Sequence, residues 1–227
     1  MIRFYSSCRK KCDPLLFPLG FKGYKQHYYR VINKVIQRVD FVKIGAYRYK
    51  ICFDFSPLCG KKVYREDEGY FDGNMIITPQ YFNEQGIQKF YEEPTEPDYW
   101  IEKFYHILDE NIIPWFELGS NSDNALCIMK YLRENCPLNR KEYGRKSFLP
   151  IEKVYFFYAQ ENKYEKFEEL FDEYIENYLM KTYPQYNLKD LAPYQFIEEY
   201  RGKTQEEVEQ ILKINEAINL KELKWNI

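Results

Sequence analysis

The residue types that most often carry nucleophilic or metal chemistry are scarce in this chain of 227 residues. It has two histidines, His27 and His106, and we expect each to lie at the surface or at the rim of the core. The spacing of the six cysteines matches no zinc motif. They occupy positions 8, 12, 52, 59, 127 and 136. We therefore expect no metal site, and we expect the cysteines to be reduced thiols that pack as small buried hydrophobic groups.

Motifs that identify catalytic sites are also missing. The sequence contains no G-x-S-x-G elbow, no G-x-x-x-x-G-K-[ST] phosphate loop and no H-E-x-x-H helix, and its glycines are too scattered for a dinucleotide fingerprint. The acidic residues between positions 165 and 176 follow one face of an amphipathic helix, which is typical of a solvated surface. The sequence predicts no catalytic residue and no cofactor, and it favours a non-catalytic protein.

Arg30 is the residue whose position most strongly suggests binding. A two-residue turn at Asn33-Lys34 places Arg30 opposite Gln37 on the apolar face of a hairpin, where it needs a partner because a buried unpaired charge is very costly. Two interpretations stay open. Arg30 caps a helix C-terminus or reaches the sheet rim, or it orients an anionic ligand in a pocket between sheet and helices. The candidate binding residues are Tyr28, Arg30, Gln37, Arg38 and Trp115.

The elements that position these residues begin with an N-terminal helix. Apolar residues at spacings of three and four predict a helix over Phe4–Leu19, and Gly20 is a suitable end. Five strand candidates with alternating or β-branched patterns follow. They cover His27–Asn33, Val35–Ile44, Arg48–Ser56, Val63–Glu66 and Asn74–Thr78.

The pairing of the second and third of these strands can be predicted from their side chains. A three-residue loop at Gly45-Ala46-Tyr47 makes Val39 oppose Phe53 and Arg38 oppose Asp54. That register joins two apolar stripes on one face and pairs opposite charges on the other. A shift by one residue would mix the two faces.

Helical periodicity replaces the strand pattern after Pro79. Three helices are predicted before the loop that follows: Gln80–Glu92, a helix that begins at Pro97 and is interrupted at Pro114, and Asp123–Asn135. Three more are predicted after it: Glu152–Gln160, Tyr164–Leu179, and a last helix that begins at the capping box of Thr204 and Glu207 and ends at Leu223. The flanks of Glu152–Gln160 favour helix over strand. An exposed loop is expected over Asn139–Ser147.

The predicted fold class is therefore α+β. An antiparallel sheet of four to five strands follows an N-terminal helix, is covered by helices, and precedes a mainly helical C-terminal half. We expect an α+β domain over residues 1–138 and a helical region packed on it over residues 148–227.

The composition, with 45% hydrophobic and 30% charged residues, is that of a globular protein and excludes a disordered chain. No run of about 18 apolar residues could span a membrane, and Met1–Tyr5 lacks the pattern of a secretory signal, so we expect a cytoplasmic protein. Tyrosine is abundant, with 23 residues. This abundance reflects a coding bias, or it marks an interface at a place where the tyrosine rings gather on the surface.

The net charge of −2 hides a separation of charge along the chain. Residues 1–65 carry 15 basic residues and three aspartates, whereas residues 66–227 carry 18 basic and 32 acidic residues. We expect the two parts to pack together and to neutralise each other. A bare basic surface would instead indicate nucleic-acid binding. The residues available for phosphate contacts are Arg3, Arg9, Lys10, Lys11, Lys22 and Lys25.

The sequence contains four short motifs, Leu19-Gly20-Phe21-Lys22, Tyr28-Tyr29-Arg30, Val35-Ile36-Gln37-Arg38-Val39 and Pro114-Trp115-Phe116. Together they resemble a bacterial family, the domain of unknown function 4304. The resemblance spans residues 1–135, and the chain departs from it at Val39–Lys43, where such proteins often carry a glutamine-rich strand. Because the family has no established activity, the resemblance implies a bacterial origin and no mechanism.

These observations predict a protein-binding module of the immunity or accessory type found beside bacterial toxins, with a protein as its partner. The prediction rests on the tyrosine content, the separation of charge and the missing catalytic motifs. Two alternatives stay open. One is a nucleic-acid-binding protein that uses the basic N-terminal residues, and the other is a small hydrolase or transferase with a site near Arg30. No oligomeric state is predicted.

Overall fold

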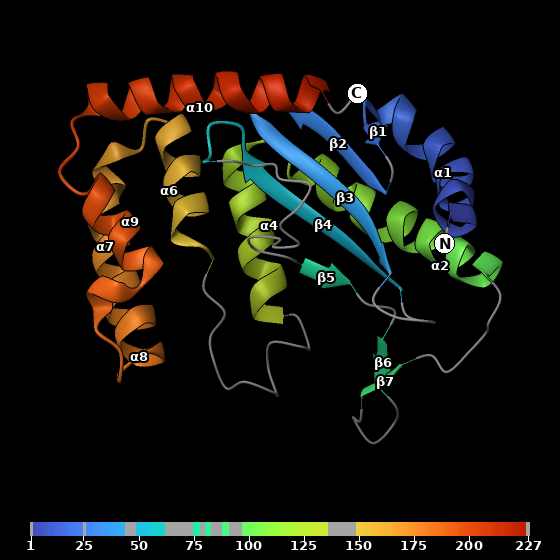
Figure 1. Ribbon diagram of the computed structural model, residues 1–227, viewed down its shortest axis with the longest axis horizontal. Coiled ribbons are helices and arrows are strands. Elements are labelled where there is room, and N and C mark those ends of the chain that lie inside the picture. The colour runs from blue at the N-terminus through green and yellow to red at the C-terminus, as the bar shows by residue number, and fades with distance from the viewer. Residues whose placement is uncertain are drawn as a thin grey trace.

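The computed structural model consists of a sheet-containing N-terminal half and a helical C-terminal half (Figure 1). It describes residues 2–24, 26–43, 49–61, 75–77, 80–82, 88–90, 97–135 and 149–225. The predicted strand Val63–Glu66 and the predicted loop Asn139–Ser147 lie outside these ranges.

An antiparallel sheet of five strands forms the centre of the N-terminal half. The chain enters it through α1 (Ile2–Leu16) and the 3-10 helix η1 (Phe17–Leu19), which ends at Gly20 with a left-handed φ of 84°. The spatial order of the strands is also their order in the sequence. They are β1 (Lys22–Tyr24), β2 (His27–Ile32), β3 (Val35–Lys43), β4 (Tyr49–Pro57) and β5 (Met75–Ile77). The predicted sheet is confirmed, although β1 was not foreseen.

The registers of the three long strands agree with those predicted from the sequence. Asn33 and Lys34 both have positive φ, 45° and 63°, which is the two-residue turn that matches the twist of a hairpin. This turn places Arg30 opposite Gln37. On the next pair of strands Val39 opposes Phe53, and Arg38 opposes Asp54.

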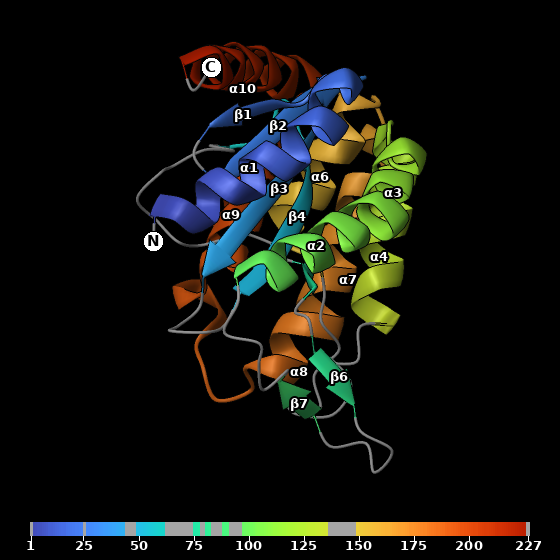
Figure 2. The ribbon, with the colours of Figure 1, turned by 90° about the vertical axis from the view of Figure 1, so that its right-hand side faces the viewer.

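Helices cover one face of the sheet. The helices α2 to α4 lie behind the strands in Figure 1 and to one side of them in Figure 2. Their described segments are α2 (Pro97–Ile107), the π-helical turn η2 (Leu108–Ile112), α3 (Ile113–Leu118) and α4 (Ser122–Asn135). The predicted interruption at Pro114 takes the form of η2, in which the Ile113 N–H donates to the Leu108 carbonyl. This wider turn ends directly before Pro114, which has no N–H to donate.

The helix predicted over Gln80–Glu92 is wrong. The described parts of this stretch are two short strands, β6 (Gln80–Phe82) and β7 (Gln88–Phe90), which pair antiparallel with Gln80 opposite Phe90. Aromatic side chains favour strands, and Gly86, between the two strands in sequence, is a poor helix former. These preferences outweigh the short apolar spacing on which the helix prediction rested.

The C-terminal half is built from helices. They are α6 (Ile151–Gln160), η3 (Tyr164–Lys166), α7 (Phe167–Tyr174), the π-helical η4 (Ile175–Leu179), α8 (Met180–Thr182), η5 (Leu188–Asp190), α9 (Ala192–Tyr200) and α10 (Gln205–Trp225). The capping box is confirmed, since the Thr204 N–H donates to Glu207 Oε2 at 2.8 Å and the Glu207 N–H donates to Thr204 Oγ1 at 3.3 Å. The Thr204 hydroxyl also donates to Glu207 Oε2 at 2.9 Å, and the two bonds that Thr204 donates hold the pKa of Glu207 below its usual range. Helix α9 was not predicted.

Helix α6 joins the two halves because it contributes to both hydrophobic cores. Val154 and Phe157 pack in the core beneath the sheet, whereas Tyr155 and Phe156 pack in the core of the helical half. On the other face of the sheet, Leu223 of α10 packs against Tyr29 and Ile36. Within the described residues, every helix is too short or too polar to traverse a bilayer.

Candidate functional site

Arg30 and Gln37 lie side by side beneath the sheet, as their register predicts. Arg30 Nε donates to Gln37 Oε1 at 2.6 Å, and Arg30 Nη1 donates to the carbonyl of Leu19 at 2.8 Å. The guanidinium also lies 4.7 Å from the centre of the Phe21 ring, and burial lowers the pKa of Arg30. Leu19 is the last residue of η1. Arg30 therefore caps the end of a helix, which is the first of the two interpretations left open by the sequence.

Gln37 is fully buried and caps a second helix end. Its Nε2 donates to the carbonyl of Phe116 at 2.5 Å and to that of Gly119 at 3.1 Å. Gly119 ends α3 where the backbone passes close to the sheet, since a Cβ there would come within 2.4 Å of the Phe55 ring. The described contacts of Arg30 and Gln37 thus fix two helix ends on the sheet.

The other predicted binding residues divide between the two faces of the sheet. Tyr28 is buried beneath it and donates its hydroxyl hydrogen to Asp13 Oδ1 at 2.5 Å, and burial, with this bond, raises the pKa of Tyr28. Trp115 is half-buried on the same side, with its ring 5.3 Å from that of Phe53. Arg38 lies on the opposite face. The structure places four of the five on one face of the sheet, where Arg30 and Gln37 are in contact, and their role toward a ligand stays a prediction.

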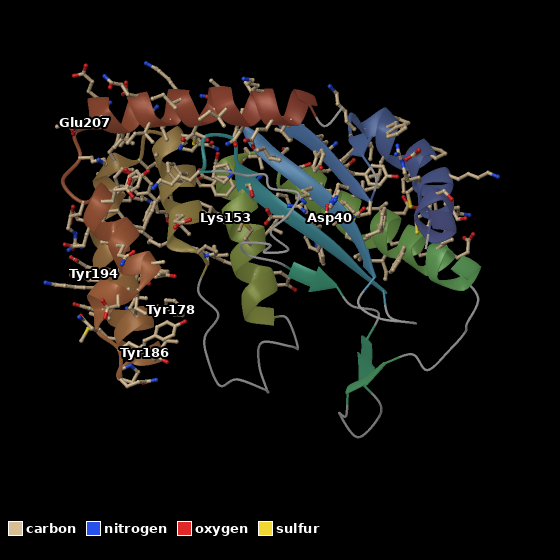
Figure 3. All side chains as sticks on the ribbon, viewed as in Figure 1. Asp40, Lys153, Tyr178, Tyr186, Tyr194 and Glu207 are labelled. Carbon is tan, nitrogen blue, oxygen red and sulfur yellow. The ribbon has the colours of Figure 1, made fainter. Side chains whose placement is uncertain are left out.

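A charged cluster on the opposite face is centred on Asp40, a fully buried residue of β3 (Figure 3). Asp40 Oδ1 accepts hydrogen bonds from His27 Nδ1 at 2.9 Å and from Arg38 Nε at 3.0 Å, and Arg38 Nη2 donates to Oδ2. His27 was expected at the surface or the core rim, without this partner. The hairpin register already places His27 opposite Asp40, so the pairing could have been predicted.

The geometry of this cluster resembles one part of an acid–base site, because a carboxylate that fixes Nδ1 orients an imidazole. A nucleophile or an acid–base partner for the other nitrogen would be needed as well. Among the described residues, His27 has Asp40 as its only hydrogen-bonding partner. His106 is exposed, as predicted, and contacts Glu110 at 3.3 Å. Within the same ranges, no three His, Cys, Asp or Glu side chains gather in a way that could hold a metal ion.

Asp54 is the second carboxylate on this face, and it binds α6. Lys153 Nζ donates to Asp54 Oδ1 at 2.5 Å and to the carbonyl of Phe55 at 3.3 Å, while Ser56 Oγ donates to Asp54 Oδ2 at 2.7 Å. The backbones of Arg38 and Asp54 oppose each other as predicted, but Arg38 binds Asp40 and Asp54 binds Lys153. The pair of Lys153 and Asp54 thus links α6 to β4, whereas the pair of Arg38 and Asp40 lies within β3.

A different kind of surface occurs at the far end of the helical half. We call the four rings of Tyr174, Tyr178, Tyr183 and Tyr186, together with the exposed Met180 of the same segment, the tyrosine surface. Successive tyrosine rings in this series are 4.9, 6.1 and 5.9 Å apart and meet edge to face. Tyr174 is buried, whereas Tyr186 is 57% exposed and Met180 is 54% exposed. The rings therefore lead from the core to the solvent, and Figure 3 shows Tyr178 and Tyr186 together at this end.

The local backbone explains why the rings gather there. Tyr174 and Tyr178 are four residues apart on a helical path, which places them on one face. The path ends at Thr182, because Pro184 cannot continue a helix, and the Tyr186 N–H donates to the Tyr183 carbonyl at 3.0 Å in a tight turn. This turn brings Tyr186 back beside Tyr183. Sequence reasoning missed the cluster because the positions after Leu179 had no predicted element.

Acidic residues are in excess in the stretch of chain that carries the tyrosine surface. Positions 164–194 contain seven acidic and three basic residues, a net charge of −4. Two of the carboxylates are bound within the fold, since Arg201 contacts Glu168 at 3.2 Å and Asp172 at 2.6 Å. Glu169, Glu173 and Glu176 are exposed. The stretch as a whole therefore carries a net negative charge, with the exposed Lys181 and Lys189 close in sequence to Tyr183 and Tyr186.

The basic N-terminal part is neutralised in two described places. Lys11 contacts Glu102 at 2.9 Å, and Lys61 contacts Glu199 at 2.9 Å, so that each lysine pairs with a later acidic helix. Among the residues proposed for phosphate contacts, Arg9 pairs with Asp13, and Lys10 and Lys22 are exposed. The side chains of Arg3 and Lys25 lie outside the described residues.

The cysteines divide by burial. Cys8, Cys12 and Cys59 are buried free thiols, as expected, and burial raises the pKa of Cys12 and that of Cys59 to about 12. Cys127 is exposed, so its predicted burial is wrong. It lies on the outward side of α4, where the helical spacing turns it away from the buried Ala125 and Met129.

Comparisons with known proteins give no family or relative for the chain. No family model, no curated protein and no solved structure matches it. The resemblance to the domain of unknown function 4304 therefore stays a prediction.

Proposed function

We propose that this protein is a non-catalytic protein-binding module and that it binds a basic partner through the tyrosine surface. The observation that carries the proposal is the series of four tyrosine rings that runs from the core at Tyr174 to the exposed Tyr186. Abundant tyrosine indicates an interface only where the rings gather on a surface, and here they do.

The chemistry of the exposed side chains suits a protein partner. Tyrosine offers a large apolar ring and a hydroxyl while losing little conformational entropy when it is fixed. Methionine adapts to irregular partner surfaces, and both residue types are enriched in the centres of interfaces. Edge-to-face contacts also hold the rings in place before binding, which lowers the entropy cost of association.

The charge of the region defines the kind of partner. The net charge of −4 over positions 164–194 would attract a basic protein surface and would repel nucleic acid. Charge complementarity of this type mainly raises the association rate, so binding should slow as the salt concentration rises.

The test is capture of partners by the full-length protein from lysates of its native cells, followed by binding measurements with the purified partner. A double variant, Met180→Ala with Tyr186→Ala, removes the two most exposed side chains of the tyrosine surface. Its control, Leu118→Ala with Tyr131→Ala, removes side chains that are 62% and 59% exposed elsewhere.

We expect a stoichiometric basic partner whose Kd rises at least about tenfold with the first variant and is unchanged with the control. Equal binding by both variants would contradict the proposal. Recovery of the protein without any partner at every concentration would contradict it as well. Binding to generic DNA or RNA that weakens steeply with salt would replace it with the nucleic-acid alternative.

A further inference from the structure

Helix α10 buries polar side chains and exposes apolar ones in its C-terminal half. Asn219 is 1% exposed and donates to the carbonyls of Leu58 and Gly60 at 2.7 and 2.9 Å, and Asn215 donates to the carbonyl of Cys59 at 2.9 Å. On the opposite side, Ile214 is 59% exposed and Ile218 is 44% exposed. The asparagines anchor the helix to the turn after β4, and the isoleucines do not contribute to that contact.

The exposed side chains form a continuous stripe. Gln210, Ile214, Ala217 and Lys221 are all exposed and are spaced by four, three and four residues, which is the spacing of a coiled-coil seam. Ile218 lies beside the seam. We call these five residues the α10 seam. The helix runs along the outer border of the molecule above both halves, and no other described element lies outside it (Figures 1 and 2).

The exposed charges of α10 change sign along the helix. Its first turn carries two exposed carboxylates, Glu206 and Glu207, whereas Lys213 and Lys221 are exposed further along. Along the line of the seam, the apolar centre therefore has Glu207 on its N-terminal side and Lys221 on its C-terminal side, while Lys213 lies beside Ile214. A surface with this layout is complementary to a copy of itself turned end to end.

We propose that the α10 seam binds the same seam of a second copy of this chain, with the two helices antiparallel. A two-fold axis between Ile214 and Ala217 places each Ile214 against Ala217 of the other copy, where the small side chain lets the helices approach closely. The same axis places Gln210 of each copy against Lys221 of the other, because both residues lie four positions from the central pair. The contact is isologous and therefore closes as a dimer.

Charge and hydrogen bonding favour this arrangement over a parallel one. In the antiparallel dimer, the Lys221 ammonium can donate to the side-chain carbonyl of the facing Gln210. It also lies three residues, or about one helical turn, from Glu207 of the other copy. A parallel pairing in register would instead set Lys221 against Lys221, which is unfavourable.

A second copy fits this surface by symmetry. An unrelated partner would need an apolar centre with an acidic and a basic group at the same distances on either side of it. The tyrosine surface lies at the opposite end of the helical half, so dimerisation leaves it accessible (Figure 3).

The strength of the contact follows from its size. A helix of 21 residues is about 30 Å long. A single helix pair of this length forms a small interface of the transient class. We therefore expect a reversible dimer with a Kd of tens of micromolar.

Sedimentation velocity of the full-length protein, from about 1 μM to about 300 μM, tests the proposal. Ile214→Glu should leave a monomer throughout this range, whereas Leu118→Glu, at a side chain that is 62% exposed on α3, should not change the Kd. Circular dichroism melting of each variant shows whether it is folded, and substitutions at Gln210 provide readouts that do not depend on the Ile214 variant.

Substitutions at Gln210 test the geometry of the pairing. Gln210→Lys sets like charges against each other twice in the dimer and should raise the Kd about fivefold, whereas Gln210→Glu creates two ion pairs with Lys221 and should lower it about threefold. Adding Lys221→Glu to Gln210→Lys should restore the wild-type Kd, because opposite charges face each other again. Gln185→Lys makes the same charge change at an exposed position outside α10 and should leave the Kd unchanged.

Three results would overturn the proposal. They are a monomer at all concentrations, a dimer that survives Ile214→Glu, and a double variant that stays as weak as Gln210→Lys alone.

Discussion

The two halves of the molecule use their polar side chains in different ways. In the sheet half, the polar side chains of Arg30, Gln37 and Asp40 form hydrogen bonds with groups of their own chain. In the helical half, tyrosines lead out of the core, and Tyr186 and Met180 face the solvent. A side chain whose hydrogen-bonding capacity is used within the fold has little left for a partner. The contrast therefore favours the helical half as the location of the proposed binding function.

The same contrast occurs inside the two cores. Tyr28 in the sheet core donates its hydroxyl hydrogen to Asp13, whereas the fully buried hydroxyl of Tyr155 has no hydrogen-bonding partner among the described residues. Tyr155 is surrounded instead by rings, among them those of Phe167, Phe171 and Tyr200. Aromatic rings also pack in the sheet core, where the rings of Phe53 and Phe55 each lie beside that of Phe116. The two cores therefore differ in whether the hydroxyl of Tyr28 or of Tyr155 has a partner among the described residues.

The largest effect is expected at Asp40. Asp40→Ala removes the carboxylate that binds Arg38 and His27 and leaves both side chains without it in a largely buried place. We expect the free energy of unfolding to fall by about 3 kcal/mol in urea denaturation, because removing one member of a buried ion pair is strongly destabilising. Asp190→Ala, at an exposed residue, should change it by less than about 0.5 kcal/mol. Equal losses of unfolding free energy in the two variants would contradict the contrast between polar groups that are bonded within the fold and polar groups that are exposed.

A second loss of stability is expected at Gly119, where the end of α3 that Gln37 caps meets the sheet. Gly119→Ala places a Cβ within 2.4 Å of the Phe55 ring and should cost about 2 kcal/mol of unfolding free energy. The cost should be smaller in a Phe55→Leu background, because the ring that clashes is absent. A double-mutant cycle measures this coupling. If the losses of unfolding free energy from the two substitutions were simply additive, the close approach to the Phe55 ring would not be the reason for a glycine at position 119.

Alkaline pH should weaken the sheet core through its buried thiols. Burial raises the pKa of Cys12 to about 12 from a reference value of 9.0. The folded chain therefore keeps a proton that the unfolded chain loses, so this contribution to stability is complete below pH 9 and is lost as the pH rises toward 12. Between pH 8 and pH 10 the wild-type protein should lose about 1 kcal/mol more than Cys12→Ala does.

The control for this experiment is Cys127→Ala, which removes an exposed thiol. Its stability should follow the wild-type curve over the same pH range. A Cys12→Ala protein with the wild-type slope would contradict the assignment of the pH effect to burial of that thiol.

The smallest effects sharpen the comparison between the two cores. Tyr28→Phe removes a hydrogen bond and leaves Asp13 without its donor, so unfolding should become easier by about 1 kcal/mol. Tyr155→Phe removes a buried hydroxyl that lacks a partner among the described residues, so the protein should gain about 1 kcal/mol. Thermal and urea unfolding of the two variants should therefore shift in opposite directions.

The sequence predicted the sheet more accurately than the surface. The registers of β2, β3 and β4 depend on alternation and on the turn at Asn33-Lys34, which are local properties. The hydrogen bond between His27 and Asp40 follows from the same register and could have been found. The strands at Gln80–Phe82 and Gln88–Phe90 were mistaken for a helix because a short apolar run does not distinguish the two structures.

The tyrosine surface could not be predicted in the same way. It depends on the π-helical turn η4 and on the turn that returns Tyr186 to Tyr183, and neither has a repeating pattern in the sequence. The partner of Asp54 was also out of reach, because Lys153 lies 99 residues away in the chain. Contacts between distant segments depend on how the two halves pack, which periodicity does not report.

Photocrosslinking in native cells tests the proposed division between the two halves most directly. A benzophenone amino acid incorporated at position 186, or at position 131 as the control, reports which surface touches a partner, since the native tyrosines there are 57% and 59% exposed. We predict a single crosslinked basic protein from position 186 and none from position 131. Crosslinks from position 131 alone would contradict the proposed division between the two halves. The absence of crosslinks from position 186, when the labelled protein is folded and abundant, would contradict it as well.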